Sequence, residues 1–69
     1  ETPHRYLQRR RVERAMWLLV ESHSSVTDIC FGVGFSSLGT FSRTFRGIVG
    51  VSPIEYRRGR APIRGAVPT

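Results

Sequence analysis

Two arginines and a run of short polar residues near the middle of the chain have types and a spacing that suit the binding of a partner. Arg43 and Arg46 are three positions apart, so on a helix they would project from neighbouring turns. An arginine presents several donors that match a phosphate group or the edge of a guanine. Short neighbouring side chains would let such a helix approach its partner closely. The candidate contact residues are Ser36, Ser37, Leu38, Gly39, Thr40, Ser42, Arg43 and Arg46.

The charge of the chain favours a polyanionic partner. Its 69 residues include 11 basic side chains, all of them Arg, against 5 acidic ones, which gives a net charge of +6. This excess favours nucleic acid over a membrane surface. No apolar run approaches the roughly 18 residues of a membrane helix, and no signal peptide is visible. We therefore expect no membrane partner.

The other reactive side chains form no catalytic or metal-binding pattern. A single Cys excludes an internal disulfide framework and favours a cytosolic setting, and we expect Cys30 to be a small buried residue. His4 and His23 have no third ligand at a suitable spacing, so we expect no metal and no cofactor. A helical chain this short offers no pocket of enzyme size, so we expect no enzyme.

Capping residues mark four helix starts, and no strand pattern is present. The first predicted helix runs from Pro3 to about residue 22, and the second starts at Ser25 and stops near Gly34. The third is capped by Ser36 or Ser37, and its signals fade between residues 47 and 50. The fourth begins at the capping box of residues 52–55 and ends near residue 58. The sequence predicts an all-α fold, a small helical bundle with a flexible tail over residues 59–69.

Apolar spacing predicts which sides of these helices are buried. A stripe on the third helix is expected to face the core, with a plug from Phe35 at the corner after Gly34. Arg11 falls on the buried side of the first helix, where it would pair with Asp28 or Glu55 or else extend to water. Tyr6, Trp17 and Val20 would form an outward apolar patch. The stripe of the third helix consists of Leu38, Phe41, Phe45 and Ile48.

A short repeat suggests that a similar unit precedes this one. The pattern [ST]-P-x-x-Y occurs at residues 2–6 and again at residues 52–56, fifty positions apart. If each unit ends in this phrase, the first copy closes a unit that lies before Glu1, and the chain is a fragment. The alternative is a coincidence of helix-start chemistry.

The second and third helices, joined at Gly34, form a helix-turn-helix pattern. The residues around it resemble the C-terminal signature of AraC/XylS-type transcription regulators. The resemblance implies a homeodomain-like fold in which residues 1–58 form a linker helix and the second of two helix-turn-helix units. The matching segments are residues 25–37, 41–46 and 50–57, with Thr2 to Leu7, Arg11, Val12, Ala15, Leu18 and Leu19 upstream.

The resemblance also implies the partners. A recognition helix at about residues 37–46 would enter the major groove of double-stranded DNA and bind it sequence-specifically in the bacterial cytoplasm, at the nucleoid. Leu38 and Gly39 stand where polar residues are common in the family, so we expect weak selectivity. Ser25, Ser36 and helix-start amides would fix the register on phosphates. Other implied partners are the first unit, an effector or dimerisation domain, and RNA polymerase.

Two other readings remain open at this stage. The chain could be a protein-interaction module that contacts polymerase or its sister unit and binds DNA weakly, because Leu38 and Gly39 read bases poorly. It could also be a basic amphipathic membrane binder, although Phe41 and Phe45 would then have to leave the core.

Overall fold

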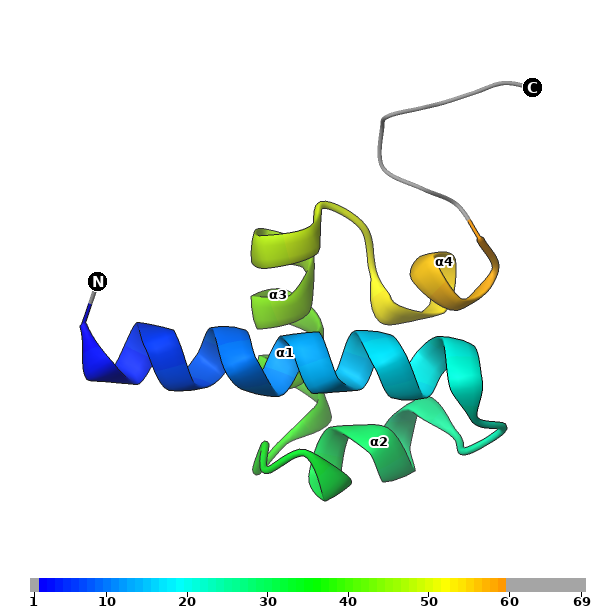
Figure 1. Ribbon diagram of the computed structural model, residues 1–69, viewed down its shortest axis with the longest axis horizontal. Helices are drawn as coiled ribbons and strands as arrows, with labels where there is room; N and C mark the ends of the chain where they lie inside the picture. The colour runs from blue at the N-terminus through cyan, green and yellow to red at the C-terminus, as the bar shows by residue number, and fades with distance from the viewer. Residues whose placement is uncertain (1, 60–69) are drawn as a thin grey trace.

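The structure, a computed structural model, describes residues 2–59 and contains four helices and no strand within them (Figure 1). Helix α1 packs against each of the other three. In Figure 1 it crosses α3, and its N-terminal half extends past that helix. The all-α prediction is confirmed, while the predicted tail lies outside the described residues except for Gly59. The helices are α1 (Pro3–Glu21), α2 (Val26–Gly32), α3 (Leu38–Val49) and α4 (Pro53–Arg57).

Each helix begins where a hydroxyl side chain caps it. The Oγ atom of the N-cap residue accepts the backbone N–H of the residue three positions later, at 3.0 to 3.2 Å in all four helices. This bond satisfies one of the amides that a helix start leaves unpaired. At α3 the cap is Ser37, not Ser36, which decides between the two predicted positions. The four caps are Thr2, Ser25, Ser37 and Ser52.

Helix α3 ends at Val49, inside the window of residues 47–50 that the sequence predicts for its end, and so extends beyond the segment 37–46 predicted to read DNA. Ser37 is extended and lies outside the helix, and the helix continues three residues further, to Val49. It passes through Gly47, which faces solvent, because one glycine weakens a helix by only about 1 kcal/mol. The helix ends at Gly50, whose φ of 102° is the left-handed conformation that glycine adopts readily.

Aromatic rings hold α3 in the core. The centroids of Phe35 and Phe41 are 5.2 Å apart, and Phe45 lies 5.7 Å from both Phe41 and Tyr56. Phe41 and Phe45 are fully buried, and Phe35 is buried at the corner as predicted. The predicted four-residue stripe is wrong at its ends, since Leu38 and Ile48 are each 39% exposed. The last residue of α3, Val49, still packs partly buried against the core, so the exposure of Leu38 and Ile48 is particular to those two side chains.

Arg11 packs against the turn between α2 and α3. Its guanidinium carbon lies 6.0 Å from the centre of the Phe35 ring, within cation–π range. Within residues 2–59 it forms no ion pair with Asp28 or Glu55, so the predicted pairing is wrong. Gly34 has a φ of 111°, and a Cβ atom there would lie 3.0 Å from Nε of Arg11. The turn therefore requires glycine for its backbone angle and for the space that Arg11 occupies.

Arg57 of α4 closes the C-terminal end of α1. Its Nε donates to the carbonyl of Leu19 and its Nη2 donates to the carbonyl of Ser22, both at 3.1 Å. These carbonyls lack partners within the helix, and a cation there also suits the helix dipole.

Cys30 is fully buried, as predicted, and burial raises the pKa of its thiol.

Candidate nucleic-acid interface

The outer face of α3 combines short side chains with two arginines. Gly39, Arg43 and Gly47 lie four residues apart in turn, opposite the buried Phe41 and Phe45. All three are exposed. A Cβ atom added to either glycine would meet nothing within 4 Å, so the rest of the described chain does not require glycine at these positions. The face is flat enough for a partner to approach the helix backbone.

The predicted contact residues lie together around this face, in three kinds of position. Ser36 lies exposed in the turn before α3, and Ser37 is the cap. Ser42 is half-buried at the side of the helix and presents less of its hydroxyl than its spacing suggests. The exposed positions on the helix are Leu38, Gly39, Thr40, Arg43 and Arg46.

The hydroxyls of Ser37 and Thr40 are already joined. Ser37 Oγ accepts the Thr40 N–H at 3.2 Å and donates to Thr40 Oγ1 at 2.9 Å. A hydroxyl has one donor, so Ser37 has none left for a base, whereas Thr40 keeps its own. Thr40 therefore keeps a hydroxyl hydrogen that it can donate to another acceptor.

Helix α1 lies beside the outer face of α3 and carries Arg9, which the sequence offers, with Arg10 and Arg14, either as a phosphate contact or as part of a solvated helix face. A cavity of about 220 Å³, with both polar and apolar lining, lies between the N-terminal half of α1 and the C-terminal half of α3. Helical spacing in the sequence already places Gly47 on the same outer side as Gly39 and Arg43. That Arg5 and Gln8 lie beside Thr44 and Ile48 could not be predicted, because it depends on how the two helices cross. The lining residues are Arg5, Gln8, Arg9, Thr44, Gly47 and Ile48.

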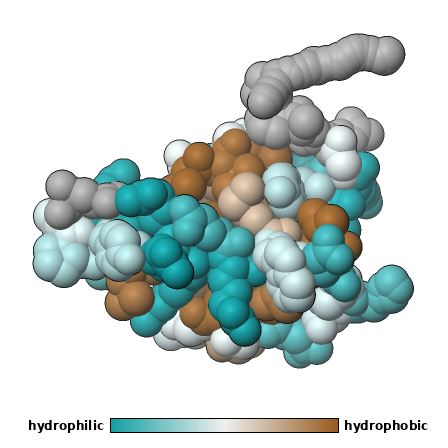
Figure 2. Space-filling model, in the orientation of Figure 1, coloured by the Kyte–Doolittle hydropathy of each residue, from teal (hydrophilic) through white to brown (hydrophobic). Residues whose placement is uncertain are grey.

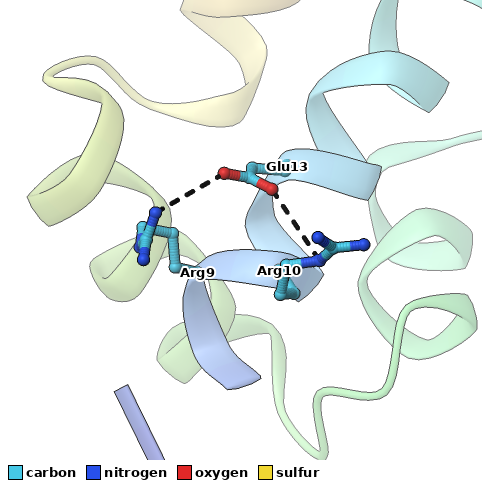
Figure 3. A network of polar contacts seen from close by, with 3 residues as sticks. All are labelled: Arg9, Arg10 and Glu13. Atoms are coloured by element: carbon cyan, nitrogen blue, oxygen red, sulfur yellow. Dashed lines mark ion pairs between the residues drawn. The ribbon is translucent and has the colours of Figure 1, made fainter. Parts of the chain in front are cut away.

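The other side of α1 carries a second group of arginines. Glu13 lies between Arg9 and Arg10, 3.9 Å from each (Figure 3). Figure 2 shows the side of α1 turned to the viewer as mainly hydrophilic. Trp17 is 62% exposed and lines a groove together with Arg10, Arg11, Glu13, Arg14 and Val33. Helical geometry places Arg10 and Arg14 opposite Val12, which faces the core.

Residues 2–59 contain no group of three His, Cys, Asp or Glu side chains that could hold a metal ion. Within the same residues, no helix has the length and apolar character to cross a membrane.

Two helices joined by a glycine turn, the second buried by its aromatic side and exposed on its basic side, define a helix-turn-helix unit. A family model described as a helix-turn-helix domain matches residues 1–59. The transcriptional activator RhaS of Escherichia fergusonii is 49% identical over 59 residues, and RhaS of Escherichia coli O1:K1 is 48% identical. The chain belongs to the AraC family of helix-turn-helix transcription regulators.

These alignments cover 86% of this chain but only 21% of each RhaS protein. The chain thus spans about a fifth of the length of the curated relatives it matches. No solved structure matches the chain.

Proposed function

We propose that this chain binds double-stranded DNA by placing α3 in the major groove. The observation that carries the proposal is the division of α3 into an inner face fixed by Phe41 and Phe45 and an outer face of glycines and arginines. A helix held in this way fits a groove about 12 Å wide without losing its packing.

The proposed contacts follow from the hydrogen-bond donors and apolar groups that each exposed side chain can still present. Arg43 lies at the centre of the exposed face and would donate to a guanine edge or a phosphate. Thr40 would donate its hydroxyl hydrogen, and Arg46 would bind backbone phosphate. Leu38 offers only contact with a thymine methyl. With so few base-reading groups, the proposed sequence selectivity of this unit is weak.

The two copies of the [ST]-P-x-x-Y phrase support a second part of the proposal, that a similar unit precedes α1. Both copies start helices, at Thr2 and at Ser52. In the second copy Tyr56 packs its ring against Phe45 of the preceding α3. In the first copy Tyr6 is 51% exposed. We propose that Tyr6 packs against the corresponding aromatic residue of the preceding unit, and that residues 1–58 are the second unit of a pair.

The proposed cellular role is that of a regulator which binds chromosomal DNA in the bacterial cytoplasm, at the nucleoid. The similar RhaS proteins are named transcriptional activators. An effector or dimerisation domain and a contact with RNA polymerase would then belong to the longer protein. Two linked units would bind DNA more tightly than one, because the second binds at a high effective concentration.

The test is fluorescence anisotropy of the 69-residue chain with a random-sequence duplex at about 50 and 200 mM salt. With about three to five phosphate contacts, log K plotted against log salt should have a slope of roughly −3 to −5. We expect Arg43→Ala to weaken binding on the order of tenfold, since one charged contact is lost. Circular dichroism should show an unchanged fold, because Arg43 is exposed.

The matched control is Arg14→Ala, which removes the same charge from the opposite side of the molecule. The proposal fails if the folded chain does not bind DNA at low salt. It also fails if both substitutions weaken binding equally, since only net charge would then matter.

A second candidate function, docking of a protein partner, is favoured by the groove at Trp17. Three arginines and an exposed aromatic ring suit an acidic segment with an apolar anchor. Trp17→Ala should then abolish capture of purified RNA polymerase and leave DNA binding intact. If Trp17→Ala leaves both polymerase capture and DNA binding unchanged, this groove has no docking function.

A further inference from the structure

The cavity between α1 and α3 opens beside the outer face of α3. Arg5, Gln8 and Arg9 form its α1 wall, and Thr44, Gly47 and Ile48 form its α3 wall. Gly47 belongs to both surfaces, because it lies one turn after Arg43 on the exposed stripe. A partner that covers the stripe would therefore also cover the mouth of this cavity.

The cavity is cationic and has no acidic lining residue. Within residues 2–59 the Arg5 side chain has no ion-pair partner. Arg9 lies 3.9 Å from Glu13, a long ion pair, and its side chain remains 44% exposed. Two guanidinium groups, an amide and the Thr44 hydroxyl thus line one space. This donor set suits an anion with several acceptor oxygens.

Gly47 lines the cavity and has no side chain to fill it. A Cβ atom there would meet nothing within 4 Å, so neither packing nor backbone angle requires glycine. The substitution of glycine for alanine in a helix costs about 1 kcal/mol, and nothing in residues 2–59 offsets this cost. The missing side chain leaves the border between the cationic cavity and the exposed face of α3 open to a partner that lies against α3.

We propose that this cavity binds a phosphate of the DNA strand that borders the groove entered by α3, with Arg5 and Arg9 as the phosphate-binding residues. This inference rests on the proposed function. It adds α1 to the DNA interface and makes that helix a clamp on the sugar–phosphate backbone. The contact fixes position and carries no base specificity.

The experiment compares two double variants of the 69-residue chain that lose the same charge from the two sides of α1. Arg5→Ala/Arg9→Ala removes both arginine side chains from the cavity, and Arg10→Ala/Arg14→Ala is the control. Each pair contains one neighbour of Glu13, Arg9 in the first and Arg10 in the second, both at 3.9 Å. The two variants are therefore matched in net charge and in the number of helix positions changed, and each loses one of the two ion pairs of Glu13.

Binding to a random-sequence duplex is measured by anisotropy from about 50 to 200 mM salt. We expect the cavity variant to bind on the order of tenfold more weakly at low salt and its log–log slope to fall by about 1, because one phosphate of the duplex is no longer neutralised. The control should change affinity by about twofold and leave the slope almost unchanged. Equal losses in both variants would overturn the inference while leaving the Arg43 result standing. Failure of the unaltered chain to bind would overturn the proposed function as well.

A second pair of variants tests charge at the cavity mouth without altering α1. Gly47→Gln and Gly47→Glu place side chains of the same shape in the space, but only the second adds a negative charge. We expect Glu to weaken DNA binding several-fold more than Gln does, because its carboxylate would repel a bound phosphate. Equal effects would show that bulk alone matters there and would contradict a bound phosphate.

Discussion

The inner and outer faces of α3 differ in how strongly packing against the rest of the chain restricts their residues. On the inner face, Phe41 and Phe45 have no exposed surface and contact rings before and after them. On the outer face, Gly39 and Gly47 contact nothing that would exclude a side chain. The same twelve-residue helix thus carries positions fixed by folding beside positions that folding leaves open.

The difference separates stability from binding within one helix. Removing an inner ring should cost stability whatever the partner, whereas changing an outer glycine should affect binding and improve the helix. A chain of this size has a free energy of unfolding of only about 3 to 10 kcal/mol, so the two kinds of effect are easily distinguished.

The largest effect should come from Phe45→Ala. The substitution removes a fully buried ring that contacts both Phe41 and Tyr56, and it should cost about 3 to 5 kcal/mol of unfolding free energy. If the free energy of unfolding lies at the low end of its range, about 3 to 5 kcal/mol, most molecules would then be unfolded at 25 °C. Urea titration followed by circular dichroism measures the change. Ile48→Ala is the control on the same helix, and its cost should be about 1 kcal/mol since Ile48 is partly exposed. Similar losses for both would remove the contrast between the faces.

Gly34→Ala should have the next largest effect, about 1 to 3 kcal/mol of lost stability. Alanine resists a φ of 111°, and its Cβ would press against the Arg11 guanidinium. Gly32→Ala is the matched control, because a Cβ atom at Gly32 meets nothing within 4 Å. Thermal unfolding of the two variants compares a glycine that the turn requires with one that it does not. A stable Gly34→Ala variant would show that the turn adapts.

The smallest effects should be gains. Gly39→Ala and Gly47→Ala should each stabilise the fold by about 0.5 to 1 kcal/mol, because alanine restricts the unfolded chain and favours a helix. The two gains should add, since the positions are eight residues apart. Urea titration measures the gain and anisotropy measures DNA binding. A variant that becomes more stable while binding DNA more weakly would sharpen the contrast between the faces, and a loss of stability would contradict it.

Local chemistry explains what could be predicted from the sequence. A cap needs only a hydroxyl and the amide three residues later, so the starts at Thr2, Ser25 and Ser52 follow from neighbouring residues. The turn at Gly34 follows from one residue type. The central aromatic pair of α3 follows from helical spacing.

Features that depend on the relative placement of helices were predicted poorly. Arg11 has acidic candidates at a distance, but the fold brings Phe35 to it instead. Leu38 and Ile48 have core-like spacing, yet the fold leaves part of each side chain exposed. The α1 wall of the cavity became visible only from the crossing of α1 and α3. The contact roles of the predicted site residues, Arg43 among them, stay predictions.

The bonds from Arg57 to the end of α1 also bear on how the protein is made. They join residues 38 and 35 positions apart, so a ribosome finishes α1 long before it adds the side chain that closes it. Until then the carbonyls of Leu19 and Ser22 have only water or transient partners. A chain released before residue 57 would lack this closure and would be more open to proteases. The C-terminal end of α1 is therefore completed only after α4 has been synthesised.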